Sequence, residues 1–333
     1  MKIIIPMAGM GTRMRPHTLT VPKPLIPVYG KPIVQRLVED ITRVCNEVVD
    51  EIAFIVHPAF GKAVEEMLVT MAQKLGAKGT ICYQAQAQGT AHAVLCAKEA
   101  LKGNVIVAFA DTLFIADFKL DTQQDAIIWV QQVQDPSAFG VVKLNSDGLI
   151  TDFVEKPKEY VSDLAIIGIY YFKDGENLCK ELQYLIDNDI HVKGEFQLTT
   201  ALENMKNKGV KFYPGKVDEW LDCGNKNATV NTNTRLLQNY GSQISKNITI
   251  ENSTIIEPCC IADGVTIRNS VVGPYVSVGE GTSISGSVID TSIVQSQANI
   301  AHARITNSMI GTKAIVQTKP LDLSVSDYSE IVQ

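Results

Sequence analysis

The chain lacks the features that mark several large classes of protein. It has no apolar run of about 18 residues, so no segment is expected to span a membrane. It has no basic stretch and a formal net charge of −6, which argues against a nucleic-acid partner. Its 7 cysteines include no Cys-x-x-Cys pair, and its first residues lack the apolar core of a signal peptide. We therefore expect a cytoplasmic globular protein with reduced, buried thiols.

Two familiar nucleotide-binding motifs are also missing. A Walker-type loop needs Gly-Lys followed by Ser or Thr, four residues after its first glycine, and the chain contains no such run. A dinucleotide-binding turn needs Gly-x-Gly-x-x-Gly, and Met14 stands where the third glycine belongs. These absences exclude a P-loop and argue against a dinucleotide-binding turn at the N-terminus.

The N-terminus does contain a strand, a glycine loop and two arginines in succession. The apolar run 3–5 leads to Gly9 and Gly11, whose missing side chains let backbone N–H groups approach an anion. Arg13 and Arg15 add charge and bidentate donors beside them. An ordinary strand-to-helix turn with incidental arginines is the alternative, since glycine turns after buried strands are common. We interpret the loop as a site for nucleotide phosphate.

Hydrophobic periodicity divides the chain into two expected domains, 1–240 and 241–333. In the first, the apolar runs 52–56 and 105–109 have the length of strands that are covered on both faces. Between them, Pro32 precedes apolar residues at helical spacing, as at the start of a helix. The alternation predicts a Rossmann-like α/β domain with a mostly parallel sheet, whose ligands bind at the carboxyl ends of the strands.

After residue 240 the helical periodicity disappears, and small or turn-forming residues separate single aliphatic side chains. These recur every five or six positions: Ile250, Ile256, Ile261, Ile267, Val272, Val278, Ile284, Ile289, Val294, Ile300, Ile305, Ile310 and Val316. Antiparallel hairpins would need longer alternating segments. The spacing predicts a left-handed parallel β-helix of hexapeptide repeats, followed from Lys319 by a C-terminal tail.

The N-terminal loop resembles the signature of the sugar-1-phosphate nucleotidyltransferases, and of the glucose-1-phosphate thymidylyl- and uridylyltransferases in particular. The resemblance is carried by Gly-x-Gly-Thr-Arg from Gly9, by Pro-Lys-Pro-Leu-Ile-Pro-Val over 22–28 and by Gly-Lys-Pro-Ile over 30–33. It implies transfer of a nucleotidyl group from a nucleoside triphosphate to a sugar 1-phosphate. Ala8 stands at a position where many relatives have glycine. The implied nucleotide-binding residues are Ala8, Gly9, Gly11 and Thr12, and the implied catalytic residues are Arg13, Lys23 and Asp111.

A second segment, 84–93, resembles the base-reading motif of the same family. There a glutamine and a glycine five residues further on contact the nucleobase, and in this chain they are Gln84 and Gly89, with Thr90 beside them. An amide side chain both donates and accepts hydrogen bonds, which suits the edge of a pyrimidine. We interpret His92 as a packing or hydrogen-bonding residue rather than a catalyst.

The resemblance further implies one cofactor, Mg²⁺, held by Asp111 and Asp222. Asp111 follows the apolar run 105–109, a position where carboxylates meet ligands in parallel sheets. Asp222 lies in Trp-Leu-Asp-Cys-Gly over 220–224, which is similar to the family's Trp-x-Asp-x-Gly motif. Hard oxygen ligands suit Mg²⁺ on a triphosphate. As alternatives, Asp111 caps a turn, or the two aspartates are ordinary surface acids.

Three further segments resemble the sugar side of the family's site. They are Phe-Gly-Val-Val over 139–142, Phe-Val-Glu-Lys-Pro over 153–157 and Gly-Glu-Phe-Gln-Leu-Thr over 194–199. By this resemblance the sugar phosphate is bound by Gly140, Glu155, Lys156 and Glu195, with the lysine on the phosphate. Taken alone, the Glu-Lys pair would be an ordinary exposed pair of charges.

The implied reaction is in-line attack of the sugar-phosphate oxygen on the α-phosphorus, helped by positioning and charge neutralisation. Arg13 is expected at the leaving pyrophosphate and Lys23 at the transferring phosphate. Glucose 1-phosphate with dTTP or UTP is the favoured pair. Mannose 1-phosphate with GTP, and N-acetylglucosamine 1-phosphate with UTP, are alternatives. A regulatory subunit that binds sugar nucleotides without catalysis is the alternative of another class.

The repeat region is expected to mediate contacts between copies of the chain in a homo-oligomer. Similar coils act as acyltransferases, an activity that needs a catalytic histidine, and His302 is the only histidine of this region. We therefore favour an interaction or allosteric role for the repeats over a second catalytic one.

Overall fold

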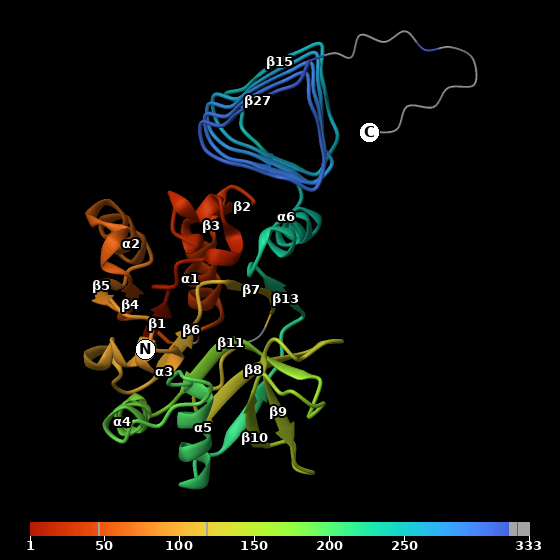
Figure 1. Cartoon of the computed structure of the whole chain (residues 1–333). Coiled ribbons are helices and arrows are strands. Elements are labelled where there is room, and N and C mark those ends of the chain that lie inside the picture. The colour runs from red at the N-terminus through yellow and green to blue at the C-terminus, as the bar shows by residue number, and fades with distance from the viewer. Residues whose placement is uncertain (46, 118, 320–324, 326–333) are drawn as a thin grey trace. The chain divides into compact units, whose positions relative to one another are not determined.

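The computed structural model describes residues 1–45, 47–117, 119–319 and 325, and the chain forms two compact units (Figure 1). The first unit comprises Met1–Ile26 and Lys31–Ala228. The second comprises Pro27–Gly30 and the chain from Thr229 onward. This division by packing falls before residue 240, where the hydrophobic period changes, so the domain boundary drawn from the sequence stays a prediction. Of the tail expected from Lys319, only Lys319 and Val325 lie within the described residues.

A mixed sheet forms the centre of the first unit. Its strands are β1 (Lys2–Pro6), β4 (Glu51–Val56), β5 (Lys78–Tyr83), β6 (Val105–Ala108), β8 (Ala126–Gln132), β9 (Gly140–Leu144), β10 (Ile150–Glu155), β11 (Leu164–Phe172) and β12 (Phe212–Gly215). The main path runs β10-β9-β11-β6-β1-β4-β5, while β8 pairs with β11 and β12. The β6-β1-β4-β5 part is parallel, and β11 runs antiparallel to β6, β8 and β9. The predicted α/β class is therefore confirmed.

Helices cover this sheet with apolar faces of the expected period. α1 (Ile33–Val44) begins directly after Pro32, whose missing N–H costs nothing at a helix start. Its buried side chains include Ile33, Leu37 and Ile41, one face of a 3.6-residue period. The other helices of the unit are α2 (Lys62–Lys74), α3 (Thr90–Leu95), α4 (Gly175–Asp187) and α5 (Leu198–Asn207). Within the described ranges, no helix has the length and apolar character needed to cross a membrane.

A short antiparallel pair of strands joins two segments that lie far apart in the sequence. β7 (Thr112–Ile115) runs antiparallel to β13 (Glu219–Asp222), so that Thr112 pairs with Asp222. The indole Nε1 of Trp220 donates to the Thr112 hydroxyl at 2.7 Å. Because β7 begins directly after Asp111, this pairing brings the two predicted metal ligands to one place.

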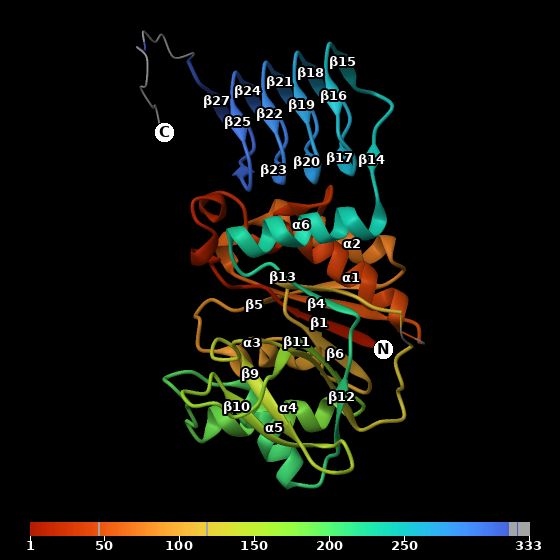
Figure 2. The same cartoon turned by 90° about the vertical axis from the view of Figure 1, so that its right-hand side faces the viewer.

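The second unit contains a coil of short strands stacked into three parallel sheets (Figure 2). The strands are β14 (Gln243–Ile244), β15 (Thr249–Glu251), β16 (Thr254–Ile255), β17 (Cys259–Ile261), β18 (Thr266–Arg268), β19 (Val271–Val272), β20 (Val276–Val278), β21 (Ser283–Ser285), β22 (Val288–Ile289), β23 (Ser292–Val294), β24 (Asn299–Ala301), β25 (Arg304–Ile305), β26 (Met309–Ile310) and β27 (Ile315–Gln317). Ile267 pairs with Ile284, and Ile284 pairs with Ile300, in successive turns. This in-register stack confirms the predicted parallel β-helix.

Two of the aliphatic positions read from the repeat do not lie in the interior of the coil. Ile256 is 43% exposed, and it is Ile255 that pairs with the buried Val272. Since successive side chains of a strand point to opposite faces, only one of two adjacent isoleucines turns inward. Ile250 is in register with Ile267 but is 45% exposed, because β15 is the edge strand of its sheet.

A buried asparagine holds the N-terminal piece of the second unit. Asn233 lies on α6 (Lys226–Tyr240) and is 0% exposed. Its Oδ1 accepts from the Tyr29 backbone N–H at 2.8 Å and from the Ser277 hydroxyl at 2.6 Å. The turn 27–30, which includes β2 (Pro27–Val28), is thereby tied to the coil; β3 (Lys31–Pro32) follows it in the chain. Replacing Asn233 would remove the acceptor of a buried backbone N–H.

Candidate active site

One cavity of about 350 Å³ lies at the carboxyl ends of the parallel strands of the first unit. Pro6 ends β1, Gln84 follows β5, and Phe109 follows β6, and all three residues line the cavity. This is the place where parallel α/β sheets bind ligands. The sequence-predicted residues among its lining are Ala8, Gly9, Gly11, Thr12, Arg13, Lys23, Gln84, Gly89, Thr90, Asp111 and Glu195. Those outside the lining are Gly140, Glu155, Lys156 and Asp222.

The two glycines of the N-terminal loop have different reasons to be glycine. Gly11 has a φ of +59°, and a Cβ there would lie 2.9 Å from Cβ of Lys23 and 2.9 Å from Cγ2 of Thr18. Gly11 is therefore required by the fold. A Cβ at Gly9 would meet no heavy atom of the described chain within 4 Å. Packing does not require glycine at position 9, whose backbone instead borders the open cavity.

A buried lysine and a half-exposed aspartate form an ion pair in the cavity. Lys23 lies in the 3₁₀ turn Lys23–Leu25 and is 7% exposed, and its Nζ is 2.9 Å from Oδ2 of Asp111. A buried ammonium needs such a partner, since an unpaired charge away from water is costly. Arg13, from the turn Thr12–Met14, lines the same cavity and adds a second cation.

Asp222 lies beside this pair, in surroundings that disfavour the negative charge of its carboxylate. Burial raises the pKa of its carboxyl group, and the nearby Asp111 carboxylate raises it further. The Gly224 N–H, which donates to Oδ1 at 2.8 Å, lowers this pKa, as do the charges of Lys23 and Arg13. A backbone bond from Cys223 N–H to the Asp111 carbonyl, 2.9 Å long, holds the two aspartates together.

These groups fit a magnesium ion that the substrate helps to hold. In the described part of the chain, no cluster of three or more His, Cys, Asp or Glu side chains forms an all-protein metal site. Mg²⁺ is commonly held by one or two carboxylates together with substrate phosphates and water. Burial raises the pKa of Asp222, and the adjacent Asp111 carboxylate raises it further, so a cation between the two groups would be favourable.

The predicted base-reading residues form a compact group in the lining of the cavity. Gln84 is 7% exposed, and its Nε2 donates to the Gly89 carbonyl at 3.3 Å. The same Nε2 lies 3.0 Å from Nδ1 of His92, which therefore has the hydrogen-bonding role expected of it. A Cβ at Gly89 would lie 2.4 Å from the Phe196 carbonyl oxygen, so this glycine permits a close backbone approach.

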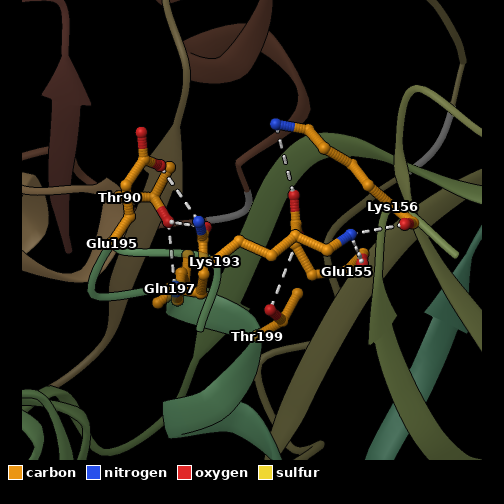
Figure 3. A network of polar contacts seen from close by, with 8 residues as sticks. Thr90, Glu155, Lys156, Lys193, Glu195, Gln197 and Thr199 are labelled. Carbon is orange, nitrogen blue, oxygen red and sulfur yellow. Dashed lines mark hydrogen bonds and ion pairs between the residues drawn. The ribbon is translucent and has the colours of Figure 1, made fainter. Parts of the chain in front are cut away.

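In the segment 194–199, which is predicted to bind the sugar, Gln197 connects Thr90 with Glu195 (Figure 3). Gln197 is 4% exposed, and its Nε2 donates to Oε2 of Glu195 at 3.0 Å. Its Oε1 accepts from the Thr90 hydroxyl at 3.3 Å, and that hydroxyl accepts from Leu198 N–H at 2.9 Å. Thr90, predicted to bind the nucleotide, is thus hydrogen-bonded to the segment predicted to bind the sugar.

The Glu155–Lys156 turn is held by a lysine from another loop (Figure 3). Nζ of Lys193 donates to the carbonyls of Glu155 and Lys156 at 3.1 and 2.6 Å. Lys156 has a φ of +45°, and its Nζ lies 3.7 Å from Oε1 of Glu155. A Cβ at Gly140 would lie 3.1 Å from Oε2 of Glu155, and the Thr199 hydroxyl donates to that oxygen at 3.5 Å. The predicted sugar residues Gly140 and Glu155 are therefore neighbours.

Sequence reasoning missed several residues of this network. Gln197 and Thr199 lie inside the 194–199 motif, so the motif itself was a signal that these side chains belong to the site. Lys193 precedes the motif as an exposed lysine, and nothing in its sequence context marks its two backbone acceptors. Phe109 lines the cavity because it directly follows a buried strand, a position that the strand pattern already indicated.

Comparison with known proteins shows the family to which the chain belongs. Residues 2–239 match the family described as Nucleotidyl transferase. The chain is 32% identical over 267 residues to the bifunctional protein GlmU of Methanococcus aeolicus, covering 77% of this chain and 60% of that protein. It is 28% identical over 273 residues to the glucose-1-phosphate thymidylyltransferase of Streptomyces antibioticus, covering 79% and 74%. The chain thus spans about 60% of the length of its GlmU relatives.

Solved structures show the same fold. A UDP-glucose pyrophosphorylase in complex with UDP-glucose superposes with a TM-score of 0.58 at 23% identity, over 72% of this chain and 98% of that one. A UDP-glucose pyrophosphorylase from Acinetobacter baumanii gives a TM-score of 0.56 at 24% identity, over 71% and 93%. With the family match over most of its length, the chain is a member of the nucleotidyl transferase family.

Proposed function

We propose that this protein transfers a nucleotidyl group from a nucleoside triphosphate to a sugar 1-phosphate and releases pyrophosphate. The observation that carries the proposal is the single cavity shared by the glycine loop, Arg13 and the Lys23–Asp111 pair. Backbone N–H groups and two cations at the carboxyl ends of parallel strands suit a triphosphate. The family membership supports the same class of reaction.

In this reaction a phosphate oxygen of the sugar 1-phosphate forms a bond to the α-phosphorus. The bond between the α-phosphorus and the oxygen bridging to the β-phosphorus breaks, and pyrophosphate leaves with that electron pair. Arg13 neutralises the leaving group, and Lys23 sits by the transferring phosphate. Lys156 binds the phosphate of the sugar, with Glu155, Glu195 and Gly140 on the sugar itself. The residues act by positioning and charge, without a protein nucleophile.

Asp111 and Asp222 would hold Mg²⁺ when the triphosphate is bound. The ion would supply charge neutralisation at the phosphates. Their own contribution is to keep two oxygen donors together at one edge of the cavity, through the β7–β13 pairing and the Cys223 backbone bond.

For the substrates we propose glucose 1-phosphate with dTTP or UTP. A relative named glucose-1-phosphate thymidylyltransferase, aligned over 79% of this chain, supports this pair. N-acetylglucosamine 1-phosphate with UTP, and mannose 1-phosphate with GTP, are the alternatives that the sequence motifs leave open. On the nucleotide side we place Ala8, Gly9, Gly11, Thr12, Gln84, Gly89 and Thr90.

The test is pyrophosphate release with Mg²⁺, across the common nucleoside triphosphates and a panel of sugar 1-phosphates. Asp111→Asn is the control, because it keeps the shape of the side chain and removes its charge. One preferred pair that Asp111→Asn no longer converts would support the proposal. Binding of sugar nucleotides without turnover of any pair would instead favour a regulatory subunit.

We also propose that the second unit mediates a homo-oligomer. Its coil leaves edge strands at both ends, such as β15 and β27, and edge strands are common sites of association. Light scattering of the full chain tests this, and a monomer at micromolar concentration would contradict it.

A further inference from the structure

The buried amide of Gln84 is held by a group that can only accept hydrogen bonds. Its Nε2 lies 3.3 Å from the Gly89 carbonyl oxygen, so the amino end of the amide has to face that oxygen. The carbonyl is itself fixed, because it also accepts the helical bond from Ala93 N–H at 3.0 Å. The turn is packed closely against the Phe196 backbone, since a Cβ at Gly89 would lie 2.4 Å from the Phe196 carbonyl oxygen.

A second acceptor fixes the same end of the amide. Nδ1 of His92 lies 3.0 Å from Nε2 of Gln84, which has only hydrogens to offer. Nδ1 is therefore unprotonated, and the ring hydrogen resides on Nε2 of the imidazole. Burial lowers the pKa of His92, which favours this neutral ring. Both N–H groups of the amide are thus used, and within the described chain no group donates to its Oε1.

We infer that His92 is a positioning residue, which holds the Gln84 amide so that its oxygen, not its amino group, meets the nucleobase. This inference rests on the proposed function, since it concerns the nucleotide subsite of the same cavity. One hydrogen bond of 3.3 Å to Gly89 alone is long and weak. The bond to His92 supplies the second contact that sets the polarity of the amide.

The polarity of the amide decides which bases fit. Uracil, thymine and guanine carry a ring N–H at the centre of their pairing edge, whereas cytosine and adenine carry a lone pair there. An amide oxygen accepts a hydrogen bond from the ring N–H of uracil, thymine or guanine. With cytosine or adenine it faces a lone pair and no hydrogen bond forms. A site built around one hydrogen bond strongly rejects a ligand that leaves its polar group unpaired. His92 thereby selects bases with a ring N–H.

The test compares His92→Leu with His92→Asn as a matched pair. Leucine removes the acceptor, and asparagine places an amide oxygen near the position of Nδ1. We measure kcat/KM for UTP and CTP with one sugar 1-phosphate, and the KM of that sugar 1-phosphate. His92→Leu should lower the UTP-to-CTP ratio about tenfold, and His92→Asn should stay within about threefold of the wild type. The KM of the sugar 1-phosphate should hold in both variants.

The inference would be overturned if His92→Leu kept the UTP-to-CTP ratio of the wild type. It would also be overturned if this ratio fell equally in both variants. Calorimetric binding of UTP and CTP measures the same ratio without turnover, so a wild type with no activity refutes the proposed function and still tests His92. If His92→Leu does not fold, the tautomer of His92 decides. Nitrogen NMR of the wild type should find Nδ1 unprotonated near pH 7.5, and a protonated Nδ1 would refute the inference.

Discussion

Replacing Lys23 by methionine should separate catalysis from folding in this site. The side chain of Lys23 is 9% exposed, and its ammonium lies 2.9 Å from Asp111, whose side chain is 43% exposed. Methionine keeps a long unbranched chain and removes the charge. Asp111 can regain water on losing its partner, so the loss should fall between that of an exposed and a buried pair. We expect the free energy of unfolding to decrease by about 1–2 kcal/mol.

The loss of kcat, expressed as a free energy, should be larger than the loss of stability. Removing one group that neutralises charge in the transition state costs on the order of 10²–10³-fold in kcat, about 3–4 kcal/mol. Pyrophosphate release gives kcat, and urea denaturation gives the stability of the same preparation. Lys31→Met is the control, because the ammonium of Lys31 forms a surface pair with Glu39 and is 45% exposed. The reasoning would be refuted if Lys23→Met kept more than a tenth of the wild-type kcat. It would also be refuted if the unfolded fraction of the variant accounted for its loss of kcat.

Three further pairs of measurements test the fold and the site. Asp222→Asn should raise the melting temperature without Mg²⁺, because it removes a buried charge whose pKa is raised, and should lower kcat at least tenfold; an unchanged melting temperature would contradict the electrostatics. Asn233→Ala should cost about 1–3 kcal/mol in urea denaturation, and Asn239→Ala, exposed on the same helix, close to nothing. Gly89→Ala should lower the melting temperature by several degrees, because its Cβ would collide with the Phe196 backbone. Gly9→Ala should leave the melting temperature unchanged, because its Cβ would meet no neighbouring atom. If phosphate lies against the Gly9 backbone, Gly9→Ala should raise the KM of the triphosphate about tenfold.

The fold was predictable where local pattern alone determines structure. The apolar runs 52–56 and 105–109 became β4 and β6, and the helix after Pro32 begins at the expected residue. The antiparallel strands around β11 were not individually predicted, because their pairing depends on contacts between distant segments. In the coil, the repeat predicted the stack, but local pattern did not tell which of Ile255 and Ile256 turns inward.

The predicted site residues come from segments far apart in the chain, and the structure gathers most of them around one cavity. Their motifs made this set predictable. Their mutual support was not, since Lys193 reaches two backbone carbonyls and Gln197 reaches Thr90 across about a hundred residues of sequence. Such contacts have no periodicity and no spacing, so only the folded chain reveals them.

The segments predicted to bind the nucleotide and the sugar are joined more closely than their separate motifs suggest. Phe196 N–H donates to the Gln88 carbonyl and Ala91 N–H to the Phe196 carbonyl, each at 2.9 Å, in addition to the side-chain bonds of Gln197. Gly89 makes this approach possible, because any Cβ there would collide with the Phe196 backbone. A displacement of the turn around Gly89 therefore displaces the loop that carries Glu195. We accordingly expect nucleotide and sugar phosphate to bind cooperatively, and a Gly89 variant to weaken the binding of both.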